Sequence, residues 1–174
     1  MAKRFTLAFG LTIVAFGTSL PAADLSAAQA SAQNPCGLLT SDEVQALVPE
    51  KEHASSGMAE AIPALESFTC RYTWGEGVKR YTLAISVNPV SRTYSGMNAD
   101  AIKQGLTSSI KPETTDATIP DIGEAAVFKA DSAGYAGASA YVKDRLLQVH
   151  LDGFEAREKK GQLISLLKSA ASRL

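Results

Sequence analysis

The stretch SFTCRYTW, residues 67–74, alternates apolar and polar side chains, and this alternation decides the fold class. Successive side chains of a strand point to opposite faces, so the stretch predicts a strand with one buried and one polar face. Gly75-Glu76-Gly77 has the composition of a turn, and residues 81–87 alternate again. Together these segments predict a β-hairpin, whose apolar side carries Phe68, Cys70, Tyr72 and Trp74.

Three helices are predicted around this hairpin. Thr40 as the N-cap and Glu43 as the third helical residue form a capping box, and Pro49 ends that helix near Val48. Residues 97–110 place apolar side chains four positions apart, which predicts a second helix. A C-terminal helix from about residue 156 is indicated by an apolar stripe at helical spacing.

Three further strands are expected in the second half of the chain. Residues 124–129 read as a short strand, and 138–143 with 145–151 read as a second hairpin. Residues 50–66 are expected to form a loop, with a short helical turn near residues 58–62. The sequence therefore predicts a two-layer α+β domain, with an antiparallel sheet of about five strands and the helices packed on one face.

The N-terminal region has the order of a secretory signal. A basic start is followed by an uncharged, mostly apolar run over residues 5–20 and by Ala-x-Ala sites that predict cleavage between Ala30 and Ala32. A retained membrane anchor is the alternative, but this run is shorter than the roughly 20 residues a spanning helix needs. We expect residues 1–32 to be the signal peptide and cleavage region, and residues 33–174 to be one periplasmic or secreted domain without a membrane span.

Export determines how the two cysteines are interpreted. Thiols in an oxidising compartment are expected to pair, so the sequence predicts a structural disulfide between Cys36 and Cys70. A redox-active pair is the alternative, but the two residues lack Cys-x-x-Cys spacing. The bridge would tie the start of the first helix to the first strand of the hairpin.

Charge and motif content exclude several functions. The net charge is −1, and no Lys/Arg run exceeds two residues, so the basic surface typical of nucleic-acid binding is not expected. No zinc-ligand spacing occurs, and His53 with Glu50, Glu52 and Glu60 offers at most a weak cation site. No nucleophile motif or phosphate loop occurs, so neither a catalytic residue nor a cofactor is assigned.

Three stretches together resemble a family of small exported bacterial domains of unknown function. Residues 36–44, CGLLTSDEV, are similar to its C-x-L-L-T-x-x-E-V opening; CRYTW at 70–74 resembles its second cysteine, and IPDIGEAA at 119–126 resembles its turn. The family includes actinobacterial lipoproteins and is similar to extracytoplasmic sensor domains of receptor kinases. The departures are Pro35 in place of a lipidation signal, the lack of a kinase, and Asp121 where glycine is usual. The resemblance implies an exported α+β domain that binds a ligand, without implying an activity.

The polar face of the sheet is the candidate binding site. If the strands are as predicted, this face includes Arg71, Tyr141, Gln148 and His150 around small residues, with Arg71 unpaired and available to an anionic group. An ordinary solvent-facing sheet is the alternative. We expect a non-enzymatic binding domain for a small molecule or a partner protein. An envelope hydrolase whose residues converge only in the fold, and a structural or inhibitory envelope protein, are the other hypotheses.

The first prediction concerns processing and the disulfide. The exported protein should begin near Ser31 or Gln33, and both cysteines should react with an alkylating reagent only after reduction. Intact-mass spectrometry with and without reductant measures both properties. A mature mass that includes residues 1–20, or two reactive thiols in the unreduced protein, would contradict the prediction.

Overall fold

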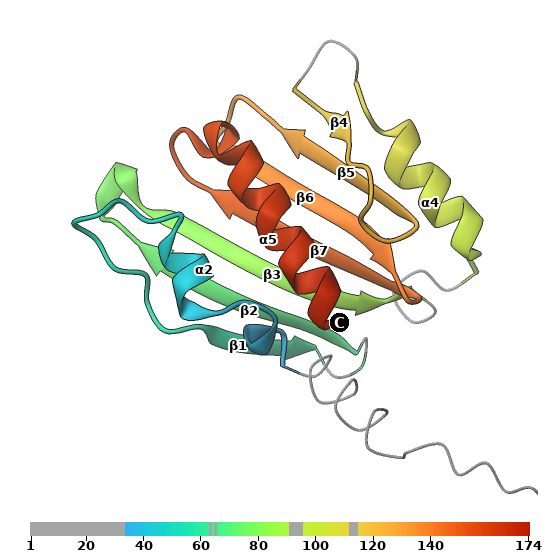
Figure 1. Cartoon of the computed structure of the whole chain (residues 1–174), viewed down its shortest axis with the longest axis horizontal. Helices are drawn as coiled ribbons and strands as arrows, with labels where there is room; N and C mark the ends of the chain where they lie inside the picture. Colours follow the sequence, from blue (N-terminus) through green and yellow to red (C-terminus); the bar gives the residue numbers. More distant parts are fainter. Residues whose placement is uncertain (1–33, 63, 65, 91–95, 112–114) are drawn as a thin grey trace, which may run out of the picture.

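The computed structural model describes residues 34–62, 64, 66–90, 96–111 and 115–174. The predicted signal peptide lies outside these residues. Within them, an α+β fold combines one sheet of seven strands with three α-helices and three short 3₁₀ helices (Figure 1). The strands are β1 (Met58–Ile62), β2 (Ser67–Trp74), β3 (Tyr81–Pro89), β4 (Ala117–Thr118), β5 (Ala125–Ala130), β6 (Tyr135–Val142) and β7 (Arg145–Asp152). The helices are η1 (Pro35–Leu38), α2 (Ser41–Gln45), η3 (Gly77–Lys79), α4 (Ala99–Ser108), η4 (Ala156–Lys159) and α5 (Lys160–Arg173). None of these helices is long and apolar enough to cross a membrane.

The sheet is antiparallel throughout, in the order β1-β2-β3-β7-β6-β5-β4. Both predicted hairpins, β2–β3 and β6–β7, are confirmed. They join in the middle of the sheet, where β3 pairs with β7 and Ile85 lies opposite Val149. The two halves of the chain therefore share one continuous sheet.

The prediction of about five strands is wrong because β1 and β4 were not foreseen. All five residues of β1 are exposed, so the sequence MAEAI lacks the alternation that would mark a strand. Its composition of Met, Ala and Glu favours a helix, which is why a helical turn was expected there. Pairing with β2 overrides this preference, as tertiary context commonly does. The other missed strand, β4, has only two residues.

One face of the sheet carries the main core. The inward side chains of β6 are Ala136, Ala138 and Ala140, all fully buried. These small residues leave room for Leu163 and Leu167 of α5, which are also fully buried and belong to the same apolar cluster. Helices α2 and η1 contribute to this cluster as well, so they cover the same face as α5 (Figure 1).

The α4 helix packs on the opposite face. Its Ile102 forms a separate apolar cluster with Val90, Tyr141 and Leu146. Tyr141 alternates with Ala140 along β6, and Leu146 alternates with the core residue Leu147 along β7, so this cluster lies on the other side of the sheet. The expectation that all helices share one face is therefore wrong for α4.

Two links fix the N-terminal helices to the rest of the fold. The predicted Cys36–Cys70 disulfide is present and joins residues 34 positions apart, from η1 to β2. In the chain-entropy account, closing a loop of this length stabilises the fold by roughly 3.5–4 kcal/mol. The second link is made by Arg173 at the end of α5. Its guanidinium donates hydrogen bonds to both carboxylate oxygens of Glu43, at 2.7 and 2.9 Å, and to the Leu38 carbonyl at 2.8 Å.

Glu43 takes part in the hydrogen bonds with Arg173 and also in the capping box with Thr40. The capping box was predicted from the sequence and is confirmed. The Glu43 carboxylate accepts a hydrogen bond from the Thr40 backbone N–H at 2.7 Å, and the Glu43 N–H donates to the Thr40 hydroxyl. The hydrogen bonds from Arg173 are the main reason that the pKa of Glu43 falls to about 2, against the opposing effect of partial burial.

The second prediction concerns acid stability. Because the pKa of Glu43 is about 2 in the folded chain and 4.5 ordinarily, the unfolded chain binds more protons between these values. The free energy of unfolding should therefore fall as the pH drops through this window. Glu43→Gln should lower stability at pH 7 by about 1 kcal/mol, since the pair is partly exposed, and should flatten the acid dependence.

Denaturant unfolding at a series of pH values measures both effects. Glu50→Gln is the matched control, because Glu50 is exposed and has no hydrogen-bond partner among the described residues. An unchanged acid dependence in Glu43→Gln would contradict the assigned role of the Arg173 link.

Candidate functional site

The face of the sheet opposite α5 is polar and largely uncovered. We call it the open face, and it consists of the outward residues of β1, β2, β3, β7 and β6: Met58, Glu60, Ile62, Thr69, Arg71, Thr73, Thr82, Ala84, Ser86, Gln148, His150, Asp152, Tyr135, Gly137 and Ser139. The α4 helix lies beyond it, over Tyr141 and Leu146, and no other described helix packs on this side.

The strand register brings three of the four predicted ligand-binding residues together. Arg71 lies opposite Ala84, which lies opposite His150 on β7, so one small buried residue separates the two larger side chains. Gln148 lies one row away, opposite Ser86 and Ser139, and its amide donates a long hydrogen bond of 3.5 Å to the Ser139 hydroxyl.

Arg71 is paired, which corrects the expectation of a free guanidinium. Its Nε donates to Oε2 of Glu60 at 2.9 Å, and the two side chains are 41% and 50% exposed. Glu60 lies on β1, so the missed strand supplies the missed partner. An exposed pair of this kind stabilises by at most about 1 kcal/mol, and it neutralises the charge of Arg71 on the open face.

His150 is the most enclosed titratable residue of the open face. Its ring lies 5.8 Å from the Tyr135 ring, and its Nε2 lies 3.8 Å from Oδ2 of Asp152. Burial is the main cause that lowers the pKa of His150; the Arg71 charge lowers it further and the Asp152 carboxylate opposes both. The neutral imidazole is therefore favoured in the folded chain.

Tyr135 was not foreseen as a site residue. A Cβ atom on Gly137 would lie 2.5 Å from the Tyr135 hydroxyl oxygen, so the tyrosine side chain lies across this glycine. The strand was predicted over residues 138–143, whereas β6 begins at Tyr135 and so includes it. A glycine between alternating residues is the signal that marks such a close approach.

Tyr141 lies outside the open face. It is 1% exposed beneath α4, and its hydroxyl donates to Oδ1 of Asp144 at 2.6 Å. This hydrogen bond is the main cause that raises the pKa of Tyr141 to about 12. Lys103 of α4 lies 5.6 Å from the ring centre. Tyr141 therefore anchors α4 and the β6–β7 turn, and the structure does not bring it together with Arg71.

His53 lines a cavity of about 780 Å³ at the β2–β3 turn, which Glu52 and Thr73 also line. His53 makes no hydrogen bond to any residue that the structure describes, and Glu60 is paired with Arg71 on β1. In the described part of the chain, no three His, Cys, Asp or Glu side chains come together in an arrangement that could hold a metal ion.

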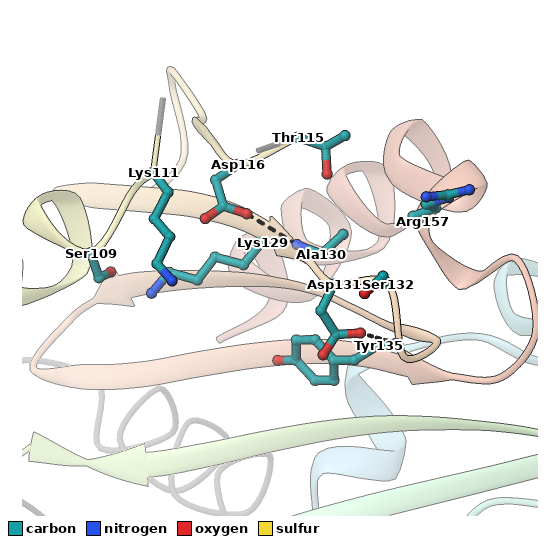
Figure 2. A pocket seen from close by; sticks show the side chains of 10 residues that line it. All are labelled: Ser109, Lys111, Thr115, Asp116, Lys129, Ala130, Asp131, Ser132, Tyr135 and Arg157. Carbon is teal, nitrogen blue, oxygen red and sulfur yellow. Dashed lines mark hydrogen bonds between the residues drawn. The ribbon is translucent and has the colours of Figure 1, made fainter. Parts of the chain in front are cut away.

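A second cavity of about 780 Å³ lies at the edge of the sheet between the end of α4 and the β5–β6 turn (Figure 2). We call it the edge cavity. Tyr135, which also belongs to the open face, is part of its wall. Its lining residues are Ser109, Lys111, Thr115, Asp116, Lys129, Ala130, Asp131, Ser132, Tyr135 and Arg157.

Comparison of the chain with models of protein families, with curated proteins and with solved structures gives no match. The resemblance to small exported domains therefore stays a prediction that rests on the three sequence stretches.

The third prediction concerns the titration of His150. Its pKa should lie below 6.5; Asp152→Asn should lower it further, and Arg71→Gln should raise it. These directions follow because the carboxylate favours the imidazolium and the guanidinium opposes it. The unfolded chain binds the proton more readily, so this group should make the protein less stable as the pH falls below 6.5. NMR titration of the imidazole signals measures the midpoints. A raised pKa in Asp152→Asn, or a lowered pKa in Arg71→Gln, would contradict the described surroundings.

Proposed function

We propose that the protein is an exported, non-enzymatic binding domain that recognises a partner protein through its open face. The observation that carries this proposal is the exposure of large apolar side chains on that face. Met58 and Ile62 are 61% and 56% exposed, and both lie on β1 on the same side as Arg71. The two side chains lie on either side of Glu60 along one strand, and apolar patches rimmed by polar side chains mark interaction surfaces.

The residue types of the open face support a protein as the partner. Met, Arg and Tyr are enriched in protein interfaces, and this face presents Met58, Arg71 and Tyr135. Small molecules generally bind in concave pockets. Arg71, Gln148 and His150 line none of the cavities described above, whereas the paired strands β1, β2, β3, β7 and β6 together offer a broad contact area.

The same geometry favours binding over hydrolysis. A hydrolase of the type considered above would need a histidine hydrogen-bonded to a carboxylate and close to a hydroxyl nucleophile. The carboxylate of Asp152 lies 3.8 Å from His150 Nε2, which is beyond hydrogen-bond distance. His53 makes no hydrogen bond within the described residues, and the lowered pKa of His150 follows from burial rather than from a catalytic partner.

Export is supported by the covalent framework. A disulfide between η1 and β2 is compatible with an oxidising compartment, where such bonds form and persist. Together with the predicted signal peptide, it favours the periplasm or the extracellular space as the place where the open face meets its partner.

The fourth prediction tests the proposed partner surface. A photo-crosslinking amino acid in place of Met58 should capture a partner in the cell envelope, whereas the same group in place of Lys168, on the exposed side of α5, should not. With the captured partner purified, Met58→Ser combined with Ile62→Ser should weaken binding about tenfold or more, because both apolar contacts are lost.

Binding calorimetry and thermal unfolding of each variant measure affinity and stability separately. Lys168→Ser serves as the control. If the double variant and Arg71→Ala keep full affinity and stability, the open face is an ordinary solvated sheet. If Arg71→Ala unfolds the chain, the Arg71–Glu60 pair is a structural requirement instead.

A further inference from the structure

The edge cavity differs from the open face in its charge. Three cationic side chains, Lys111, Lys129 and Arg157, line it together with the carboxylates of Asp116 and Asp131. A fourth cation is adjacent, since Lys160 donates a hydrogen bond to the backbone carbonyl of Thr115 in the cavity wall at 3.2 Å. Positive charge therefore exceeds negative charge around this space, although the whole chain is close to neutral.

Both carboxylates of the cavity are held by backbone N–H groups. Asp131 Oδ1 accepts hydrogen bonds from the N–H groups of Ala133 and Tyr135, at 2.8 and 3.0 Å. Asp116 Oδ1 accepts one from the Ala130 N–H at 3.2 Å (Figure 2). These bonds fix the carboxylates to the β5–β6 turn and to the edge of β5.

Two of the cations have no such partner. Lys129 and Arg157 make no hydrogen bond or ion pair with any residue that the structure describes, whereas Arg71, Lys103 and Arg173 are each paired with a carboxylate. Figure 2 shows Lys129 extending towards Lys111 at one end of the cavity, with Arg157 at the other end. Hydroxyl groups of Thr115, Ser132 and Tyr135 also line the space.

We propose that the edge cavity binds a small polyanion, a molecule with phosphate or carboxylate groups at separated positions. Lys129 would contact one anionic group as a point charge, and the Arg157 guanidinium would hold another through paired N–H donors. A volume of about 780 Å³ suits a drug-sized or metabolite-sized molecule. The site shares Tyr135 with the open face but draws its cations from other residues, since Arg71 of the open face is paired with Glu60 and does not line the cavity.

The experiment uses the exported, disulfide-bonded protein with pyrophosphate, tripolyphosphate and citrate as probes, and with phosphate and acetate as probes of lower charge. All are compared at matched ionic strength. The polyanions should raise the melting temperature and give saturable heats in calorimetry, with phosphate and acetate weaker. NMR shifts on titration should centre on the backbone of residues 129–132. A preference for the phosphates or for citrate distinguishes a phosphorylated ligand from a polycarboxylate.

Lys129→Gln and Arg157→Gln should each weaken the binding of the strongest probe about tenfold, because each removes a charge-assisted contact. Neither side chain has a partner in the described fold, so both variants should melt at the temperature of the parent protein. Lys168→Gln is the matched control for loss of one positive charge and should bind normally. Met58→Ser should also bind normally, which separates this site from the open face.

Three results would overturn the proposal. The first is that no probe binds at concentrations up to about 1 mM. The second is full affinity in the variant that combines Lys129→Gln with Arg157→Gln. The third is an equal loss in Lys168→Gln, which would show attraction to the general charge of the protein.

Discussion

The disulfide between Cys36 and Cys70 is the constraint on which the arrangement of the helices depends. Cys70 is fully buried on β2, so the bridge holds η1, and α2 directly after it, against the same face of the sheet that α5 covers. Arg173 then closes this layer from the other end of the chain, through its hydrogen bonds to Glu43 and Leu38. One covalent and one ionic link thus fix both ends of the described chain on one face.

Because η1, α2 and α5 all pack on one face of the sheet, few described helices remain to cover the other face. Among the helices that the structure describes, only α4 packs there, and it covers the end of the sheet at Tyr141 and Leu146. The chain reaches that side because Val90, the residue after β3, is buried in the α4 cluster and donates its N–H to the Asp144 carbonyl in the β6–β7 turn. The described helices therefore leave the open face largely uncovered, and its polar residues match this exposure.

The alternation of apolar and polar side chains along single strands could be read from the sequence. It correctly placed Arg71, Gln148 and His150 on the polar face of the sheet. Pairs between strands could not be predicted where one strand was missed. Glu60 could not be predicted as the partner of Arg71, because the five residues MAEAI are all exposed and show no alternation that would identify them as a strand. Tyr141 alternates in the same way as its neighbours, and only the position of α4 buries it. Lys129 and Arg157 are distant in sequence, so nothing in the charge pattern placed them around one cavity.

Tyr135 links the two surfaces of the domain. Its ring contacts His150 on the open face, while the same side chain lines the edge cavity. Gly137 permits this position, because a Cβ atom there would meet the tyrosine hydroxyl at 2.5 Å and the flexible ring would have to move. The Tyr135 phenol is protonated near neutral pH, and burial raises its pKa further, so its hydroxyl can donate a hydrogen bond to an anion. The edge cavity and the open face therefore share the Tyr135 side chain, while the cations that line the cavity come from other elements than Arg71.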